Sequence, residues 1–372
     1  MTIHSKHIAV TGSSGFLGWH LRCYARSLGF QFIEIPDDAF RSTAALAKLL
    51  DSSDVVIHLA GMNRGTESEV YSTNLELTHK LIASLELLNN APTVIFANSI
   101  HSLGGSYFGR SKKDTSILLA AWADAHNSRY VDLILPHLFG EGGRPFYNSA
   151  FATFCYQLTR GEVPQVNHAG EVELVHAQLV ARQIWEFAFD GTTQGLIRLE
   201  GHRMPISETL GRLRTIHEKY MDGIIPSFAS ALDLDFFNTY RSYLFPEHCP
   251  VYLAGRKDSR GVLFEAVKSL HGGQAFLSTT HSGVTRGRHY HHRKLERFLV
   301  VSGEAEIRIR RLFDDEVYVF QVRGSEPCYI DIPTFHTHEI SNVGSNDLLT
   351  LFWSNEIFDP FNSDTYPEVV VQ

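Results

Sequence analysis

Four potential metal ligands stand in two clusters in the last quarter of the chain. His289 and His291 are two residues apart, Glu296 follows them closely, and His338 comes later. Alternation along a strand places the first two histidines on one face, and a turn returns the carboxylate to that face. Three imidazoles and one carboxylate suit a divalent transition metal such as zinc, iron, nickel or manganese. Among 20 histidines some pairs arise by chance, but four ligand types in this order favour a metal site.

The residues around these ligands resemble the cupin superfamily, which implies a β-barrel that holds the metal. Gly283 precedes the first cluster, Pro333 precedes His338, and the resemblance covers roughly residues 262–353. Phe335 departs from the glycine that is common at its position. The other groups near the ligands that are able to move a proton are His292, Lys294 and His336, and the sequence does not rank them.

A glycine-rich turn near the N-terminus follows an apolar run and opens an amphipathic stretch. Small residues let this backbone turn tightly and approach a pyrophosphate, which then lies at the helix N-terminus. The spacing resembles extended short-chain dehydrogenases/reductases and predicts a dinucleotide site. Its expected contacts are Gly12, Ser14, Gly15, Phe16 and Leu17, then Leu59, Ala60 and Gly61 from a later strand, and Lys112. Acidic Asp37 and Asp38 would favour NAD, whereas Arg41 would meet the 2′-phosphate of NADP.

The catalytic residues of that reductase family depart from their usual pattern here. The family places a tyrosine four residues before a lysine, with a serine upstream, and the tyrosine protonates the carbonyl as hydride arrives. Ser99 and Lys112 match, but Phe108 stands where the tyrosine belongs. Three explanations are open: Tyr107 acts through a shifted loop, the reductase has lost its acid, or Phe108 was introduced to trap a complex.

The order of apolar and amphipathic segments predicts an α/β fold followed by an all-β fold. Alternating strands and helices from residue 7 onward indicate a Rossmann-like, doubly wound parallel sheet. After Pro246 short strand-like runs separated by turns indicate an antiparallel barrel or sandwich. We therefore expect a dinucleotide-binding domain over residues 1–246 and a cupin domain over residues 247–372. Helices are expected at Leu179–Phe189 and Ser207–His217, and C-terminal strands at Arg297–Val301, Ala305–Arg310 and Val317–Val322.

Charge and composition exclude several classes of protein. The 372 residues carry a net charge of −8, which opposes nucleic-acid binding. The sequence has neither a signal-type apolar segment nor a run of bilayer length, so a cytoplasmic protein without membrane contact is expected. The four cysteines are scattered without paired spacing, which favours reduced thiols.

Nearly the whole chain resembles the CapF/WbjC family of capsular polysaccharide and O-antigen synthesis enzymes. Characteristic strings are His58–Arg64, Arg144–Ser149, Ala152–Cys155, Phe298–Gly303 and Asn355–Pro360. The resemblance implies C3 epimerisation of a UDP-2-acetamido-2,6-dideoxy-4-hexulose in the cupin half. It also implies NADPH-dependent reduction of the C4 ketone in the reductase half, on the route to UDP-N-acetyl-L-fucosamine. Zinc and a homodimer are expected on the same basis.

The substrate should be held by a few polar groups of the reductase half. Arg144 is the expected contact for the UDP-sugar pyrophosphate, because a guanidinium binds phosphate oxygens in a fork, and Asn148 would position the same ligand. Catalysis is expected from Ser99, Tyr107 and Lys112 in this half and from Lys294 and His336 in the cupin half. The alternative hypothesis is an epimerase, or a sugar-nucleotide-binding protein, whose reductase half is inactive.

Overall fold

The computed structural model describes residues 6–166 and 170–371, which form two compact units. The first unit comprises the chain up to Thr153 together with Val166–Ile206. The second comprises Phe154–Gln165 and the chain from Ser207 onward. The chain first passes from one unit to the other within helix α5 (Ala150–Thr159). Among the described residues, no helix is both long and apolar enough to cross a bilayer.

A six-stranded sheet in the order β2-β1-β3-β4-β5-β8 forms the centre of the first unit, and all its pairings are parallel. Its inner strands are buried on both faces, which explains their continuous apolar runs. The strands are β1 (Ile8–Thr11), β2 (Ile33–Ile35), β3 (Val55–His58), β4 (Thr93–Ser99), β5 (Tyr130–Leu135) and β8 (Gly195–Arg198).

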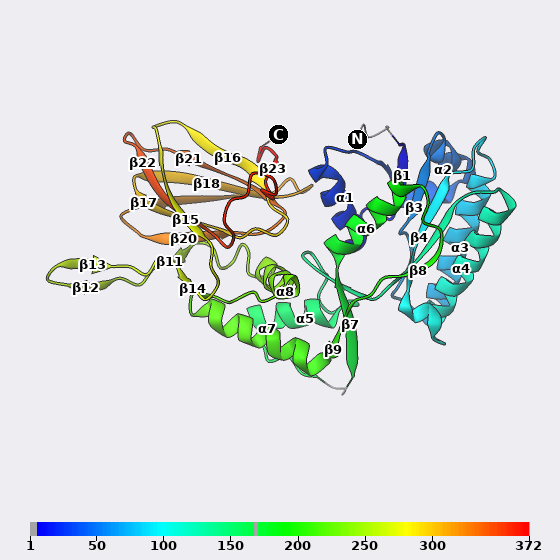
Figure 1. The fold of residues 1–372 in the computed structure, drawn as a ribbon, viewed down its shortest axis with the longest axis horizontal. Coiled ribbons are helices and arrows are strands. Elements are labelled where there is room, and N and C mark those ends of the chain that lie inside the picture. The colour runs from blue at the N-terminus through cyan, green and yellow to red at the C-terminus, as the bar shows by residue number, and fades with distance from the viewer. Residues whose placement is uncertain (1–5, 167–169, 372) are drawn as a thin grey trace. The chain divides into compact units, whose positions relative to one another are not determined.

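Helices cover both faces of this sheet, so it is doubly wound (Figure 1). Helices α1 (Phe16–Ser27) and α6 (Ala177–Asp190) pack together on one face, with a core that includes Leu21 and Ile184. The other face carries α2 (Thr43–Leu50), α3 (Glu67–Leu85) and α4 (Tyr107–Ala125). Short 3-10 helices η1 (Asp37–Arg41) and η2 (Ile100–Leu103) follow β2 and β4.

A smaller sheet in the order β6-β7-β9 completes the first unit. Its strands are β6 (His137–Phe139), β7 (Glu171–His176) and β9 (His202–Pro205). Strand β6 directly continues the path of β5 after Pro136, so it extends from the carboxyl edge of the main sheet.

Two five-stranded antiparallel sheets form most of the second unit. One has the order β11-β20-β17-β22-β15, with strands β11 (Val251–Tyr252), β20 (Cys328–Ile332), β17 (Glu296–Ser302), β22 (Leu348–Ser354) and β15 (Gln274–Thr280). The other has the order β19-β18-β21-β16-β23, with strands β19 (Val317–Arg323), β18 (Glu304–Arg311), β21 (His336–Asn342), β16 (Thr285–Tyr290) and β23 (Tyr366–Pro367).

The core of this unit draws on both sheets, with Phe298, Ile307 and Ile340 among its buried members. Helices α7 (Ile206–Met221) and α8 (Ala231–Ser242) precede the sheets. A two-stranded pairing joins β10 (Ile224–Ile225) to β14 (Lys268–Ser269). The hairpin of β12 (Arg256–Asp258) and β13 (Gly261–Leu263) projects away from the two sheets (Figure 1).

The predicted fold class, an α/β half followed by an all-β half, is confirmed by these sheets. The expected helices at Leu179–Phe189 and Ser207–His217 lie within α6 and α7, and the three expected C-terminal strands lie within β17, β18 and β19. Compact packing divides the chain near Ile206, because α7 and α8 cluster with the antiparallel sheets. The functional division at residues 246 and 247 stays a prediction, as does closure of the two sheets into a barrel.

Candidate functional site

The glycine-rich turn links β1 to α1 and has no room for side chains at two positions. Gly12 has a φ of +69°, and a Cβ there would lie 2.6 Å from the backbone nitrogen of Ala60. A Cβ on Gly18 would lie 2.3 Å from the carbonyl oxygen of Gly12. The turn therefore packs directly on the end of β3 and on the first turn of α1, as a dinucleotide-binding turn requires.

The N-terminus of α1 is open to an anion. Gly15 caps the helix without a side-chain hydrogen bond, so its first N–H groups are available to a phosphate. Ser14 is exposed at this end, while Phe16 and Leu17 begin the helix. Leu59 and Ala60 follow β3 directly beside the turn.

Glu34 of β2, which was not predicted from the sequence, contacts the glycine-rich turn. The Ser13 hydroxyl donates to Glu34 at 3.1 Å, and the Arg22 guanidinium lies 3.1 Å from the same carboxylate. The predicted ribose contacts, Asp37 and Asp38, instead begin η1 beyond the strand end. The alternation of apolar residues in β2 was the available signal for Glu34, since it marks that position as facing away from the core.

Adding one methyl group in this turn should weaken cofactor binding. Gly18→Ala would place its Cβ 2.3 Å from the Gly12 oxygen and 2.6 Å from Ser13 Cα, both rigid backbone atoms. We expect the Kd for a reduced nicotinamide dinucleotide, measured by fluorescence titration, to rise by about 5- to 160-fold, because about 1–3 kcal/mol of overpacking must be relieved. Gly105→Ala is the matched control, because a Cβ there meets nothing within 4 Å. Equal affinity of both variants would contradict this prediction.

Lys112 lies beneath the carboxyl edge of the sheet. Its Nζ donates to the Ala97 carbonyl oxygen at 2.8 Å and lies 4.6 Å from the centre of the Phe96 ring. Burial lowers the pKa of Lys112 to about 8, while Asp132 acts in the opposite direction. A Cβ on Gly61 would lie 3.7 Å from Nζ, so the segment after β3 passes close to this lysine.

Ser99 ends β4 at the same edge, and its hydroxyl accepts the His101 N–H at 3.2 Å. Asn74 holds the neighbouring backbone: its side chain accepts from the Met62 N–H at 2.6 Å and donates to Ser111 at 2.9 Å. These bonds join α3, α4 and the segment after β3. The structure thus gathers Ser99, Lys112 and the dinucleotide turn at one edge, as the sequence predicts for a reductase site.

The two aromatic residues that begin α4 face different neighbours. The Phe108 ring lies 5.9 Å from Lys112 Nζ. The Tyr107 ring lies 4.7 Å from the Arg110 guanidinium and 6.5 Å from the Tyr71 ring of α3. On a helix Phe108 and Lys112 are about 40° apart, whereas Tyr107 and Lys112 are about 140° apart. Phe108 therefore occupies the tyrosine position, and the predicted role of Tyr107 stays a prediction that this geometry does not favour.

The predicted substrate residue Arg144 shares an aromatic neighbour with Arg64. Both guanidinium carbons lie over the Tyr147 ring, Arg144 at 5.1 Å and Arg64 at 5.3 Å. Arg64 also donates to the Phe146 and Tyr147 carbonyl oxygens. Asn148 contacts the Asn63 carbonyl oxygen at 3.4 Å. The sequence analysis did not single out Arg64, although the string His58–Arg64 contains it.

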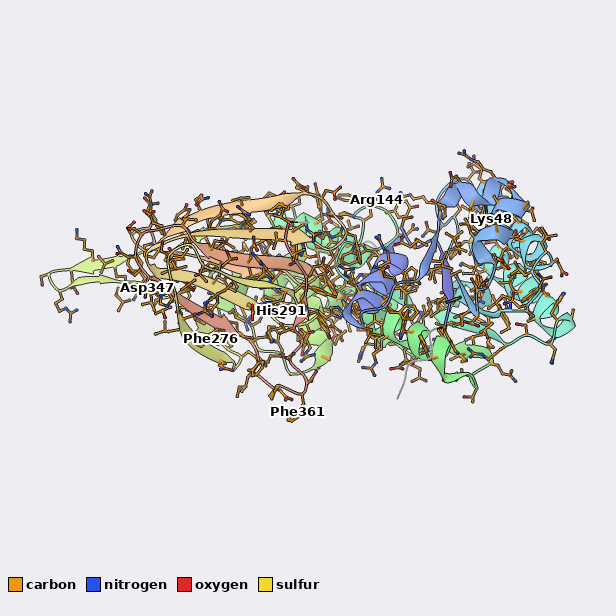
Figure 2. The ribbon with its side chains drawn as sticks, turned by 90° about the horizontal axis from the view of Figure 1, so that it is seen from above. Lys48, Arg144, Phe276, His291, Asp347 and Phe361 are labelled. Carbon is orange, nitrogen blue, oxygen red and sulfur yellow. The ribbon has the colours of Figure 1, made fainter. Side chains whose placement is uncertain are left out.

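In the second unit, the four predicted metal ligands converge. His289 on β16 pairs directly with His338 on β21, next to a bulge in the register after Gly287. His291 follows β16 and lies among the strands of this unit (Figure 2). Glu296 begins β17 in the other sheet. The ligand atoms of all four residues lie within 4.8 Å of one another.

The geometry of this cluster fits a cation. Glu296 Oε2 lies 3.1 Å from His291 Nε2, 3.3 Å from His338 Nε2 and 3.7 Å from His289 Nε2. Within the described part of the chain, the buried Nε2 atoms of His291 and His338 have no hydrogen-bond partner. Unsatisfied buried nitrogens facing one carboxylate are costly unless another group joins them. A divalent metal bound by three imidazoles and one carboxylate satisfies them all.

Second contacts orient the imidazoles toward the centre of the cluster. His291 Nδ1 lies 2.6 Å from the Asp364 carbonyl oxygen, and His338 Nδ1 lies 3.2 Å from the His336 carbonyl oxygen. Each Nδ1 must donate to its carbonyl, which leaves the Nε2 lone pair for a metal. Burial lowers the pKa of His338 to about 4. Burial alone would raise the pKa of Glu296, yet the imidazoles hold it well below its usual range, so this ligand is a carboxylate.

The predicted proton-transfer residues occupy different surroundings. Lys294 is buried, and its Nζ donates to the Ser363 carbonyl oxygen at 2.6 Å. His336 precedes His338 on β21 by two residues and so shares its face of the strand. The His336 ring lies 5.2 Å from the Phe245 ring. The His292 ring packs 4.7 Å from Tyr366.

Asp364 clamps the turn that carries His291 and Glu296, a role the sequence analysis missed. Its carboxylate accepts the backbone N–H groups of His292, Arg293 and Lys294 at 3.2, 2.9 and 2.8 Å. Asp364 itself has a φ of +47°, which only the surrounding packing stabilises.

Asp364→Ala should therefore weaken metal binding without removing a ligand. The three N–H groups lose a charged acceptor, and the turn no longer holds His291 Nε2 in place. We expect the metal affinity to fall by about 10- to 100-fold, as is usual when the partners of metal ligands are lost. Competition with a chelator measures it. Asp347→Ala, at an exposed carboxylate of the same unit, is the control, and equal affinities would contradict the clamp.

Comparisons with known proteins cover both units. Residues 8–190 match the NAD dependent epimerase/dehydratase family, and residues 256–366 match the polysaccharide biosynthesis C-terminal domain. Over 364 residues the chain is 30% identical to UDP-2-acetamido-2,6-beta-L-arabino-hexul-4-ose reductase of Pseudomonas aeruginosa, with 96% of this chain and 97% of that protein aligned.

Solved structures are also similar. The capsular polysaccharide assembling protein CapF of Staphylococcus aureus is 30% identical, with a TM-score of 0.61 over 98% of this chain and 100% of that one. UDP-N-acetylglucosamine 4-epimerase of Bacillus cereus is 20% identical, with a TM-score of 0.51 over 57% of this chain and 82% of that one. The second similarity concerns the fold alone.

Proposed function

The chain belongs to the CapF/WbjC family of capsular polysaccharide synthesis enzymes, and from that premise we propose that it is a bifunctional sugar-nucleotide enzyme. Its second unit epimerises C3 of a UDP-2-acetamido-2,6-dideoxy-4-hexulose. Its reductase half then reduces the C4 ketone with NADPH to the L-talose sugar, on the route to UDP-N-acetyl-L-fucosamine. The observation that carries the proposal is the pair of unsatisfied, buried Nε2 atoms facing Glu296.

The epimerase step needs a stabilised enolate and a group that moves the C3 proton. A zinc ion held by His289, His291, Glu296 and His338 would act as a Lewis acid near the ketone oxygen. His336, on the same strand face as His338, is the proposed proton carrier. Lys294, whose Nζ is bonded to the Ser363 carbonyl, holds the turn between His291 and Glu296 and is the second candidate.

The reductase step relies on the carboxyl edge of the parallel sheet. NADPH would supply the hydride, with its pyrophosphate at the N-terminus of α1. Lys112 would contact the nicotinamide ribose, and the Ser99 hydroxyl would orient the ketone oxygen. Arg64 and Arg144 both lie against the Tyr147 ring, and their guanidinium groups would bind the UDP pyrophosphate.

Two measurements with the full chain and the 4-keto UDP-sugar test these assignments. The metal-loaded protein should exchange the C3 proton with deuterated water, and adding NADPH should lead to its oxidation. Absence of C3 exchange in folded, metal-loaded protein would reject the epimerase, and absence of NADPH oxidation would reject the reductase.

Phe108 favours a second candidate function, a C3 epimerase whose reductase half only binds ligands. A phenyl ring has no proton to give, and Phe108 lies where the family's tyrosine would stand beside Lys112. C3 exchange without NADPH oxidation would select this alternative. NADPH over NAD, zinc over other metals, a homodimer and a cytoplasmic location are further parts of the proposal, each drawn from the family resemblance.

A further inference from the structure

Two histidines lie side by side at the carboxyl edge of the parallel sheet. Ser99 and Leu135 are paired at the ends of β4 and β5, and His101 and His137 each follow two residues later. Their ring centres are 5.3 Å apart, with the ring planes at 79°. The His101 ring is also 6.0 Å from the Phe108 ring. An imidazole therefore stands next to the residue that replaces the catalytic tyrosine.

The backbone holds His101 firmly in this place. Its N–H donates to Ser99 Oγ at 3.2 Å, and its carbonyl oxygen accepts the Gly104 N–H at 2.9 Å. A Cβ on Gly109 would lie 2.0 Å from that same oxygen, so the first turn of α4 packs directly on His101. The residue is nonetheless exposed, which leaves its side chain accessible to a ligand.

Three other residues at this edge are less well placed than His101 to supply the proton. Phe108 carries no acidic hydrogen, and Tyr107 lies on the part of α4 that faces Tyr71 and Arg110. Lys112 Nζ is already bonded to the Ala97 carbonyl beneath the edge. An imidazolium is a common general acid near neutral pH.

We propose that His101 donates the proton to the ketone oxygen in the reductase step, in place of the missing tyrosine hydroxyl. This inference rests on the proposed reductase function. The ketone carbon accepts a hydride from the reduced nicotinamide, and the carbonyl electron pair moves to oxygen. That oxygen takes a proton from the His101 imidazolium, so a secondary alcohol and an oxidised nicotinamide result. The neutral imidazole regains its proton from water.

Charged and titratable neighbours surround the histidine pair. Burial lowers the pKa of His137, His101 lowers it further, and Glu173 of β7 acts in the opposite direction. The Lys112 ammonium of α4 lies 5.9 Å from the centre of the Phe108 ring. His137 thus favours the neutral state.

The test compares His101→Gln, Phe108→Tyr and the double variant in the full chain with the 4-keto UDP-sugar and NADPH. A general acid contributes about 10²- to 10⁴-fold, so kcat should fall by at least about 100-fold in His101→Gln. Adding Phe108→Tyr to the His101→Gln variant should recover at least about a tenth of the lost kcat, because the tyrosine hydroxyl then supplies the proton. His79→Gln, an exposed histidine on α3, is the matched control and should keep the wild-type rate.

Two readouts do not depend on turnover. The Kd for NADPH should be unchanged in His101→Gln, which separates loss of the acid from loss of cofactor binding. In NMR titrations without ligands, His101→Gln should raise the pKa of His137, because a neighbouring positive charge is removed. An unchanged pKa of His137 would overturn the proposed pair.

The remaining outcomes separate this inference from the proposed function. Full activity of His101→Gln would overturn the role of His101 and leave the reductase intact. An inactive wild type that gains NADPH oxidation on Phe108→Tyr would overturn the role of His101 and show that the native reductase has lost its acid. If neither protein oxidises NADPH although C3 exchange proceeds, the reductase function itself fails, and the role of His101 fails with it.

Discussion

His338→Ala should eliminate both metal binding and C3 exchange. The imidazole is fully buried, and its Nε2 lies 3.3 Å from Glu296 Oε2 at the centre of the cluster. Losing a group that only supports a metal ligand lowers metal affinity by up to about 100-fold. Losing one of the four ligands themselves should therefore lower it by more than about 100-fold. Elemental analysis after dialysis measures the metal content. Deuterium incorporation at C3 measures the reaction.

The matched control is His281→Ala in the same unit. That histidine is largely exposed and contacts Asp347, so its loss should change neither metal content nor exchange. Binding of NADPH to His338→Ala should remain at the wild-type level, because the dinucleotide turn belongs to the other unit. Full metal content in a folded His338→Ala protein would contradict the proposed metal centre.

Asp331→Ala should strongly destabilise the second unit. Asp331 accepts two hydrogen bonds from the Arg297 guanidinium at 2.7 and 2.8 Å and one from the Tyr220 hydroxyl at 2.6 Å. Arg297 is 2% exposed and lies 3.5 Å from the centre of the Tyr329 ring. Removing the carboxylate leaves a buried, unpaired cation, which costs about 3–5 kcal/mol. Urea denaturation followed by tryptophan fluorescence, to which Trp353 of this unit contributes, would measure the loss.

Two variants make this prediction specific. Asp258→Ala removes a carboxylate from an exposed pair with Arg260 and should leave the urea midpoint unchanged. The double variant Arg297→Met with Asp331→Leu removes both buried charges and should recover much of the stability. A single Asp331→Ala variant as stable as the wild type would contradict the proposed cost of the unpaired arginine.

The pH dependence of this pair has a definite sign. Burial alone would raise the pKa of Asp331, but Arg297 holds it below its usual range. The pair therefore stabilises the fold above the unfolded carboxyl pKa of about 3.9. That stabilisation is lost as the pH falls through the folded value, because the unfolded state then binds its proton more readily.

The sequence by itself determined the features that depend on nearby residues. The glycines of the dinucleotide turn could be identified because a strand, a tight turn and a helix start follow one another directly. The spacing of His289, His291 and Glu296 likewise identified the candidate metal ligands, because it is a local property of the sequence. The alternation of strands and helices in the first half fixed its parallel sheet in the same way.

Only the tertiary structure decided which distant residues meet. Glu296 joins the histidines from the opposite sheet, and Asp364 reaches their turn from a late loop. His101 meets His137 because β4 and β5 pair in a register that sets both histidines beyond the same sheet edge. Such contacts join residues far apart in the chain, so they follow from strand register and packing. Local residue preferences do not encode them.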